Sequence, residues 1–302
     1  MPLAINKLTE HIGAEVQGIE IAAPIDAATF AQLRSAFHQY AVLVFRDQKI
    51  TDAQQVAFSA GFGALEMTIP SDPIGDGGPV GILSNVDEKG QIFPPDDTRM
   101  LYYKGNSLWH SDGSFKQVPL RGSLLAAKVV PPTGGETEYA SLRAAYNTLP
   151  EKKKAALEGL LAEHSLAHSR QQISPNLVSE AFLKDTPPVE QPLVRTILAT
   201  SEKVLLVGSY TTRIIDWPLA AGKALLDELL DWSTQPQFIY RHTWQAHDLV
   251  MWDNRLCLHR ARSFDSENHQ RIMHRTTLAG DQSRIDSPKS CREVEKGEIE
   301  KF

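Results

Sequence analysis

Short apolar segments, many of them rich in β-branched residues, recur along this chain of 302 residues. Some alternate apolar and polar residues, as half-buried strands do, and others are apolar runs between turn residues, as core strands are. The segments with these patterns are 14–21, 41–47, 122–130, 203–210, 238–244, 248–254 and 274–280. So many short strands with only a few helices predict a mainly β fold, a sandwich or barrel with flanking helices.

Apolar residues recur at helical spacing in four other segments, which are 27–40, 51–63, 141–162 and 218–232. Asp26 and Thr51 stand at the starts of the first two segments, where a side-chain oxygen can cap the first backbone N–H groups. We therefore expect these segments to form helices that pack outside the strands.

Two long segments interrupt the predicted strands. Residues 64–105 contain five prolines and the sequence GDGG, and residues 164–190 are mostly polar. Loops this long inside a compact domain are usually functional, for example as active-site lids. We expect one domain over residues 1–302, with lid-like insertions near 64–105 and 168–190.

Composition excludes several classes of protein. The formal net charge is -6, which gives no electrostatic footprint for nucleic acid. No run of eighteen apolar residues predicts a membrane span, and the first residues do not resemble a secretory signal. The two cysteines, Cys257 and Cys291, cannot form a disulfide scaffold. We expect a cytoplasmic protein that acts on small molecules, and the sequence leaves open whether it forms a homo-oligomer.

The sharpest local motif is Trp109-His110-Ser111-Asp112. If it lies on a strand, residues i and i+2 point to one face, so His110 and Asp112 would aim an imidazole and a carboxylate at one point. His259, just beyond the predicted strand 248–254, can supply a third ligand. Two histidines and one carboxylate, with other coordination positions open, are typical of non-haem ferrous oxygenases.

Other interpretations of these histidines stay open. A lone HxD motif also arises by chance, and its histidine can be an ordinary polar residue near a strand end. His164 and His168 are spaced to share a helix face and could bind zinc. No HExxH motif accompanies them, so we interpret this pair as surface or insertion histidines.

A pair of arginines suggests an anion site, and a nearby glycine turn is by itself only a turn. Arg271 and Arg275 are four residues apart on a predicted strand, so both should point to the same face, where a guanidinium can hold a carboxylate by two hydrogen bonds. The alternative is that they form a solvated strand face. The turn Gly134-Gly135 presents Thr137 at the start of the next segment.

Taken together and in order, these motifs resemble the taurine dioxygenase and dichlorophenoxyacetate dioxygenase (TauD/TfdA) family of Fe(II)- and α-ketoglutarate-dependent dioxygenases. The resemblance covers nearly the whole chain and is closer to the herbicide-degrading TfdA branch. Its motifs are GAEVQGIEI, AVLVFRDQ, FGALE, LWHSDGSF, LLAAKVVPPTGGETEY, LVMWDNRLCLHRA and RIMHRTTLAGD. The resemblance implies a double-stranded β-helix core, the jelly-roll or cupin-like fold, with helices outside.

The resemblance also implies a role for each matching residue. His110, Asp112 and His259 match the iron ligands. Arg271 and Thr137 match the residues that bind the distal carboxylate of α-ketoglutarate. The substrate pocket is matched by Arg275, which faces the substrate anion, by Asn106 and by Tyr210. The implied reaction uses O2 and α-ketoglutarate to oxidise a small anionic organic substrate, by hydroxylation or a related C–H oxidation such as ether cleavage, and releases succinate and CO2.

The sequence departs from the family at two places that bear on the substrate. Met67-Thr68-Ile69-Pro70 replaces the substrate-binding histidine and tyrosine of the taurine enzymes, and Tyr210 stands where the herbicide branch has a histidine. The primary substrate is therefore not identified, although Met67, Ile69 and Tyr210 indicate a pocket that is more apolar or differently shaped than in the taurine enzymes. We expect a small carboxylate held by Arg275; the alternative is that Arg275 pairs with a structural carboxylate such as Asp253.

Two other functions would use the same residues. A catalytically silent barrel could bind an organic acid without turnover, and a zinc hydrolase could use the same three ligands with a metal-bound water. Arg271 and Thr137 favour a ketoacid site over both.

Overall fold

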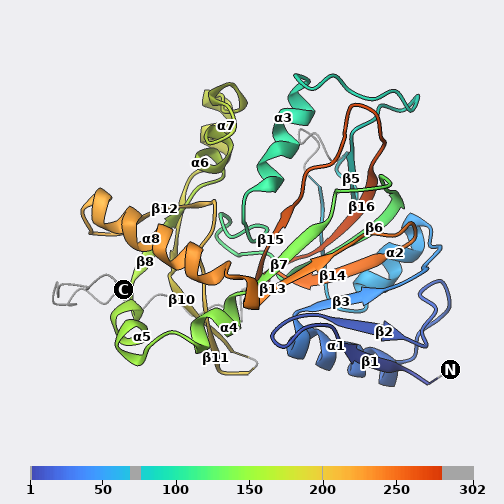
Figure 1. Ribbon diagram of the computed structural model, residues 1–302, viewed down its shortest axis with the longest axis horizontal. Coiled ribbons are helices and arrows are strands. Elements are labelled where there is room, and N and C mark those ends of the chain that lie inside the picture. The colour runs from blue at the N-terminus through green and yellow to red at the C-terminus, as the bar shows by residue number, and fades with distance from the viewer. Residues whose placement is uncertain (1, 69–75, 199, 281–302) are drawn as a thin grey trace.

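A computed structural model describes residues 2–68, 76–198 and 200–280 of the chain, and its largest element is an eight-stranded sheet (Figure 1). In spatial order this sheet contains β1 (Ala4–Lys7), β2 (Ala14–Gln17), β3 (Val42–Phe45), β14 (Leu249–Asp253), β6 (Gly122–Val129), β16 (Ile272–Leu278) and β4 (Leu65–Glu66), and β5 (Val80–Ser84) also pairs with β16. All neighbours are antiparallel except β2 and β3, which are parallel. The predicted strands at 41–47, 122–130, 248–254 and 274–280 are therefore adjacent in this sheet.

A smaller antiparallel sheet faces the large one. It contains β13 (Ile239–His242), β7 (Thr137–Ser141) and β15 (Cys257–Ala261) in that order. A buried apolar cluster joins the two sheets, with Val44, Val250 and Met273 from the large sheet and Tyr139 and Cys257 from the small one. The prediction of a mainly β core with helices outside is confirmed at this level.

Two helices cover the other face of the large sheet. α1 (Ala27–Tyr40) and α2 (Asp52–Ala60) bury Leu33, Phe37 and Phe58 against residues of the strands. Both predicted caps are present, because the Asp26 carboxylate accepts a hydrogen bond from the backbone of Thr29 and Thr51 forms a capping box with Gln54.

A third group of elements packs beside the small sheet around its own apolar cluster. The strands are β8 (Leu161–His164), β9 (Val189–Pro192), β10 (Val194–Ile197), β11 (Glu202–Leu205) and β12 (Thr211–Ile214), and the helices are α4 (Leu142–Asn147), α5 (Glu151–Leu157), α8 (Leu219–Ser233) and η3 (Pro236–Phe238). The predicted helix over 218–232 is confirmed by α8. The prediction of helix throughout 141–162 is wrong, because Pro150 disfavours a helical conformation in the residue before it and separates α4 from α5. After α5 the chain continues into β8.

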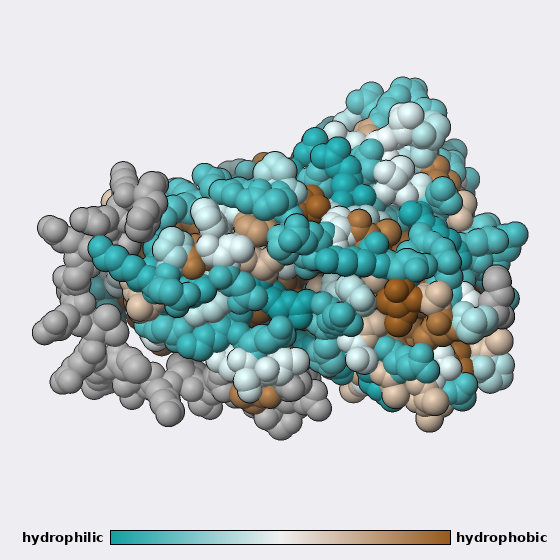
Figure 2. Space-filling view, turned by 60° about the horizontal axis from the view of Figure 1, so that its bottom comes forward, coloured by the Kyte–Doolittle hydropathy of each residue, from teal (hydrophilic) through white to brown (hydrophobic). Residues whose placement is uncertain are grey.

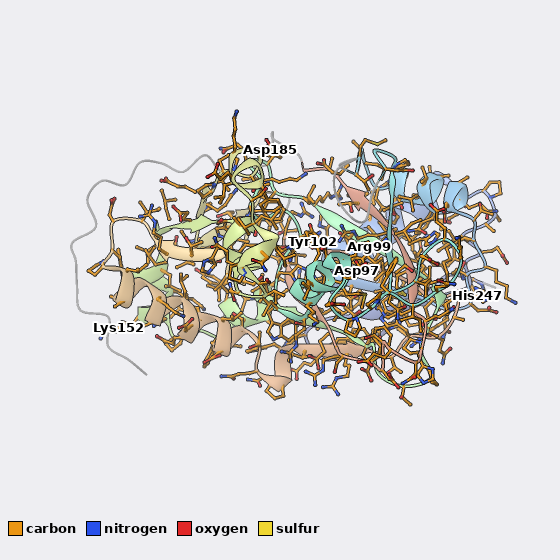
Figure 3. The ribbon with its side chains drawn as sticks, turned by 90° about the horizontal axis from the view of Figure 1, so that it is seen from above. Asp97, Arg99, Tyr102, Lys152, Asp185 and His247 are labelled. Carbon is orange, nitrogen blue, oxygen red and sulfur yellow. The ribbon has the colours of Figure 1, made fainter. Side chains whose placement is uncertain are left out.

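The two predicted insertions hold more regular structure than their composition suggests. The first contains β4, β5, α3 (Thr98–Lys104) and η1 (Gly105–Ser107), and the second contains α6 (Leu166–Gln171), η2 (Pro175–Leu177) and α7 (Glu180–Asp185). In Figure 1, α3, α6 and α7 rise from the same side of the molecule. Figure 3 shows Tyr102 on α3 toward the helices of the second insertion, and the guanidinium of Arg170 lies 4.1 Å from the Tyr102 ring centroid.

The surface in Figure 2 is largely hydrophilic, with smaller hydrophobic areas between the polar residues. Exposed large hydrophobic side chains, such as Met67 and Leu219, are scattered along the described part of the chain. None of the helices within those ranges is long and apolar enough to cross a membrane.

Candidate metal centre

His110 and His259 lie side by side because their backbones form one antiparallel bridge. The N–H of His110 donates to the carbonyl of His259 at 3.0 Å, and the reverse bond is 2.8 Å. His259 belongs to β15, whereas His110 is in no strand and is followed by a turn that begins at Asp112. The prediction that His110 and Asp112 lie on one strand is therefore wrong, and the turn directs the carboxylate back toward the imidazole.

The three predicted metal ligands nevertheless converge. Nε2 of His110 lies 3.7 Å from Oδ1 of Asp112, and Nε2 of His259 lies 3.8 Å from Oδ2 of the same carboxylate. One potential ligand atom from each residue lies within 4.8 Å of the others, and all three residues are buried. Within the described ranges, no other group of three or more His, Cys, Asp or Glu residues meets in this way. The arrangement has the donor set of a site with two histidines and one carboxylate.

Hydrogen bonds beyond the three ligands fix the orientation of Asp112. Its Oδ2 accepts from the hydroxyl of Ser123 at 2.8 Å, and its backbone N–H donates to Oδ1 of Asn254 at 3.1 Å. Asn254 is itself held, because it accepts from the Trp252 indole at 2.9 Å and donates to Ser123 at 3.2 Å. Partners of this kind keep a ligand in one rotamer before the metal binds.

The histidines are oriented by different means. Nδ1 of His110 lies 2.7 Å from the carbonyl of Leu108, so Nδ1 carries the proton and the Nε2 lone pair faces Asp112. The ring of His259 is held by aromatic packing, with the Trp252 centroid at 4.7 Å and the Tyr139 ring stacked at 6.3 Å. Nδ1 of His259 is buried without a hydrogen-bond partner among the described residues.

Burial and nearby charges put the three ligands in the protonation states that a metal requires. Burial lowers the pKa of His110, and burial together with His110 lowers the pKa of His259 to about 3, so both imidazoles are neutral. Burial alone would raise the pKa of Asp112, but the charge of Arg275 and the hydrogen bond from Ser123 hold that pKa well below its usual range. The centre therefore offers two lone pairs and one carboxylate anion at neutral pH.

Arg275 lies beside the same carboxylate. Its Nη1 is 3.6 Å from Oδ1 of Asp112, and the Arg275 side chain is 22% exposed. The alternative that Arg275 pairs with Asp253 is wrong, because Asp253 forms its ion pair with Arg255. The turn that begins at Asp112 instead places the Asp112 carboxylate within reach of Arg275 on β16.

Arg271 directly precedes β16 and is two residues before the buried Met273. Its backbone N–H donates to the Asn85 side chain at 2.7 Å, while its guanidinium Nε is buried and has no hydrogen-bond partner among the described residues. Burial lowers the pKa of Arg271 to about 10, and no described carboxylate forms an ion pair with it. A cation in this state is suited to bind an anionic ligand.

Thr137 lies on β7, two residues before Tyr139, so both side chains point to the same face between the sheets. A Cβ placed on Gly135, at the turn before Thr137, would come within 3.3 Å of Nε of Arg271, so the glycine turn and Arg271 are in close contact. The predicted ketoacid residues are therefore on neighbouring elements.

A cavity of about 340 Å³ opens beside Arg271. Its wall includes Asn106 from η1, together with apolar side chains of Leu83, Met100 and Phe264. Asn106 and Arg271 therefore share one cavity, as the prediction of a common site requires.

The remaining predicted pocket residues differ in position. Tyr210 is buried with its ring centroid 5.8 Å from that of His110 and 4.9 Å from that of Phe115. Met67 is 53% exposed and is not part of the cavity wall, so it does not make that pocket more apolar. Ile69 and Pro70 lie outside the described residues.

The interpretation of His164 as a surface histidine is wrong. His164 is at the end of β8, is 1% exposed, and its Nδ1 lies 3.1 Å from the Ser114 hydroxyl. His168 is in α6, so the two residues do not share a helix face and form no metal site of the kind considered.

Sequence reasoning missed residues that support the site without carrying a motif. Ser123 and Tyr139 look like ordinary strand residues, and Arg170 lies in a polar insertion. No local motif marks them, because only the tertiary structure shows which residues of other strands, turns and helices they contact.

Comparison with known proteins places these features in a family. The family model described as "Taurine catabolism dioxygenase TauD, TfdA family" matches residues 4–277. An α-ketoglutarate-dependent 2,4-dichlorophenoxyacetate dioxygenase from Burkholderia sp. (strain RASC) is 40% identical over 274 residues, which cover 87% of this chain and 90% of the relative. An (S)-phenoxypropionate/α-ketoglutarate dioxygenase from Sphingobium herbicidovorans is 36% identical, over 92% of this chain and 95% of the relative.

A solved structure agrees with these relatives. The crystal structure of AAD-2 in complex with Mn(II) and N-oxalylglycine matches with a TM-score of 0.87 and 40% sequence identity. The match covers 95% of this chain and 100% of that chain.

Proposed function

This chain belongs to the taurine catabolism dioxygenase TauD, TfdA family and is an α-ketoglutarate-dependent dioxygenase, and we propose that it binds Fe(II) through His110, Asp112 and His259 and oxidises a small organic carboxylate. The convergence of two neutral imidazoles and one carboxylate within 4.8 Å carries this proposal. Imidazole and carboxylate are ligands that suit ferrous iron, and three protein ligands leave positions for co-substrate and O2.

The residues around the metal centre have separate tasks. When bound, iron supplies the O2 chemistry that is coupled to conversion of α-ketoglutarate to succinate and CO2. Arg271 and Thr137 hold the distal carboxylate of the ketoacid, and the unpartnered Nε of Arg271 supports this assignment. Buried aromatic residues around His259 exclude water from the centre.

Arg275 binds the anionic group of the primary substrate. Its only described ion pair is with Asp112, at a distance too long for a hydrogen bond. When a divalent cation shares that carboxylate, the Arg275 charge is available for a second anion. The names of the relatives specify phenoxy acids, which are carboxylates of this kind. Asn106 lines the cavity beside Arg271, and Tyr210 packs against the ring of His110, so we propose both as residues that shape the substrate site.

Succinate release with a panel of small carboxylates tests this function. We expect the wild-type enzyme to release succinate only when Fe(II), O2 and α-ketoglutarate are all present. Arg275→Leu should raise the KM for the carboxylate by about 30-fold or more, since losing one partner of a desolvated ion pair costs at least about 2 kcal/mol. Its ketoacid affinity should stay unchanged.

The controls separate the alternatives. Arg213→Leu removes an exposed arginine of β12 and should leave both constants unchanged. Product formation without O2 or ketoacid would favour a zinc hydrolase, and binding of carboxylates without succinate would favour a silent barrel. Equal turnover of neutral amide analogues would contradict the anionic substrate.

We also propose that residues 1–302 form a single catalytic domain on a double-stranded β-helix core, supported by the two facing sheets and by the family match over residues 4–277. Cys257 is a buried free thiol, which fits a cytoplasmic location. A measurement of the molecular mass in solution determines whether the chain forms a homo-oligomer.

The segments 64–105 and 168–190 are proposed to cover the metal centre as lids. α3 and η1 form one wall of the cavity, and Arg170 of α6 contacts Tyr102 of α3, so the two segments meet. We expect faster hydrogen exchange in α3, α6 and α7 than in β6 and β14, with protection after Mn(II), ketoacid and substrate are added. Slow exchange throughout both segments in the substrate-free protein would contradict lid movement.

A further inference from the structure

A buried indole holds the hydroxyl of Thr137. Nε1 of Trp244 donates to Oγ1 of Thr137 at 3.0 Å, and both residues are less than a tenth exposed. Trp244 belongs to the apolar cluster between the two sheets. It lies in the loop between β13 and β14, more than 100 residues after Thr137 in the sequence.

This bond fixes the direction of the Thr137 hydroxyl proton. An indole N–H can only donate, so Thr137 must accept. A hydroxyl has one hydrogen to donate, and among the hydrogen bonds of the described residues Thr137 donates none. The hydroxyl hydrogen is therefore left to point away from Trp244, and none of the described residues provides an acceptor for it. A carboxylate consists only of acceptors and satisfies this donor.

A buried polar network holds Trp244 in turn. The ring of His242 packs edge-on to Trp244, with centroids 4.5 Å apart at 81°. His242 is fixed on both nitrogens, by the Tyr240 hydroxyl at 2.9 Å and by Asp248 at 3.1 Å. Asp248 also accepts from the backbone N–H of Gln245, the residue next to Trp244, at 2.8 Å, and from Arg46 at 2.5 Å.

Such a network needs a structural reason. Burying Asp248 and His242 costs desolvation free energy. If the loop only had to pack, apolar residues would stabilise it equally well. Neither residue forms a hydrogen bond to any of the three predicted metal ligands. The network runs from the partly exposed side chain of Arg46 to the loop that carries Trp244. Its effect is to hold the indole N–H toward Thr137.

We infer that Trp244 is a positioning residue that fixes Thr137 as a hydrogen-bond donor to the co-substrate carboxylate. The inference rests on the proposed role of Thr137 and Arg271 in binding α-ketoglutarate. Arg271 supplies the charge and Thr137 supplies a directed donor, and the indole prevents the hydroxyl from turning its lone pair toward the anion.

Titration of α-ketoglutarate into the full-length protein loaded with Mn(II), which does not support turnover, tests the inference. We expect Trp244→Phe to raise the Kd for the ketoacid by about 3- to 10-fold, the value of one hydrogen bond. Thr137→Val should raise it by at least as much, and Thr137→Ser should stay close to the wild type. The double variant Trp244→Phe/Thr137→Val should bind no more weakly than Thr137→Val alone, because the indole acts through the hydroxyl.

Three outcomes would overturn the inference. One is an unchanged Kd for α-ketoglutarate in Trp244→Phe. Another is that adding Trp244→Phe to Thr137→Val raises this Kd by the same factor as Trp244→Phe does in the wild type, which indicates that Trp244 acts by packing alone. An unchanged Kd in Thr137→Val would overturn the ketoacid assignment of Thr137 as well, whereas a loss in Thr137→Val without one in Trp244→Phe would leave that assignment standing.

A matched control and a second readout guard against misfolding. Trp232→Phe removes an indole that donates to the Ala145 carbonyl at 2.9 Å in another core cluster, and it should leave the Kd unchanged. If Trp244→Phe does not fold, NMR spectroscopy of the wild-type protein loaded with Zn(II) tests the inference instead. The signal to follow is the assigned indole 1H–15N resonance of Trp244. This resonance should shift when α-ketoglutarate is added and should not shift in Thr137→Val; an unmoved wild-type resonance would overturn the inference.

Discussion

The variants Asp112→Ala, His110→Ala and His259→Ala are each expected to lose bound iron and at least about 10³-fold of α-ketoglutarate turnover, on the order of 4 kcal/mol. Each removes one of the three ligand atoms that meet within 4.8 Å. Asp112 should have the largest effect, because it is the only anion of the centre and because its loss leaves Arg275 beside the two imidazoles. Without the carboxylate, the site would repel a divalent cation.

Metal content and succinate release, measured on the same preparations, check this prediction. Asp227→Ala removes an exposed carboxylate of α8 that pairs only with Lys223, and it should retain metal and activity. Ser123→Ala should be intermediate, with metal affinity about 10- to 100-fold weaker, since the Ser123 hydroxyl orients Asp112. Melting curves identify any variant that is unfolded. Full metal content and activity in one of the three ligand variants would remove that residue from the centre.

Arg271→Ala is expected to be the second most damaging change, and its effect should fall on the co-substrate. The guanidinium is buried, has an unpartnered Nε and lies against the glycine turn that leads to Thr137. Loss of the charged partner of a buried carboxylate costs about 2–5 kcal/mol, so the Kd for α-ketoglutarate should rise by about 30-fold or more. Metal affinity should change little, since Arg271 forms no ion pair with the ligands.

Calorimetric titration of the Mn(II) protein with α-ketoglutarate measures this change directly. Arg213→Ala is the matched control, because Arg213 is an exposed arginine of β12 outside the cavity wall, and it should leave the Kd unchanged. Arg271→Lys should recover part of the affinity, because it restores a charge without the two-pronged hydrogen bonding of a guanidinium. An unchanged Kd in Arg271→Ala would place the ketoacid elsewhere.

The sequence by itself determined the features that depend on local periodicity. Asp26 and Thr51 begin the two helices that cover the large sheet, as their capping chemistry predicted. Alternation predicted a strand that carries Arg275, and β16 confirms that strand, with Arg271 directly before it. These predictions succeed because a helix or strand repeats its side-chain directions every few residues, and that period is present in the chain before it folds.

Local pattern failed where a turn or a proline decided the structure. Pro150 divides a segment that has helical spacing throughout, and a turn at Asp112 replaces the strand predicted for the ligand motif. The three predicted ligands still meet within 4.8 Å, although His110 and Asp112 do not lie on one strand.

Only the tertiary structure decided which side chains meet. Arg275 lies beside Asp112 and not Asp253, Ser123 orients the metal ligand, and Trp244 donates to Thr137. Each of these contacts joins different strands or loops, and most of them join residues more than 100 positions apart. Such contacts depend on strand register and on how two sheets pack, and a shift of one residue in register would turn these side chains to the other face.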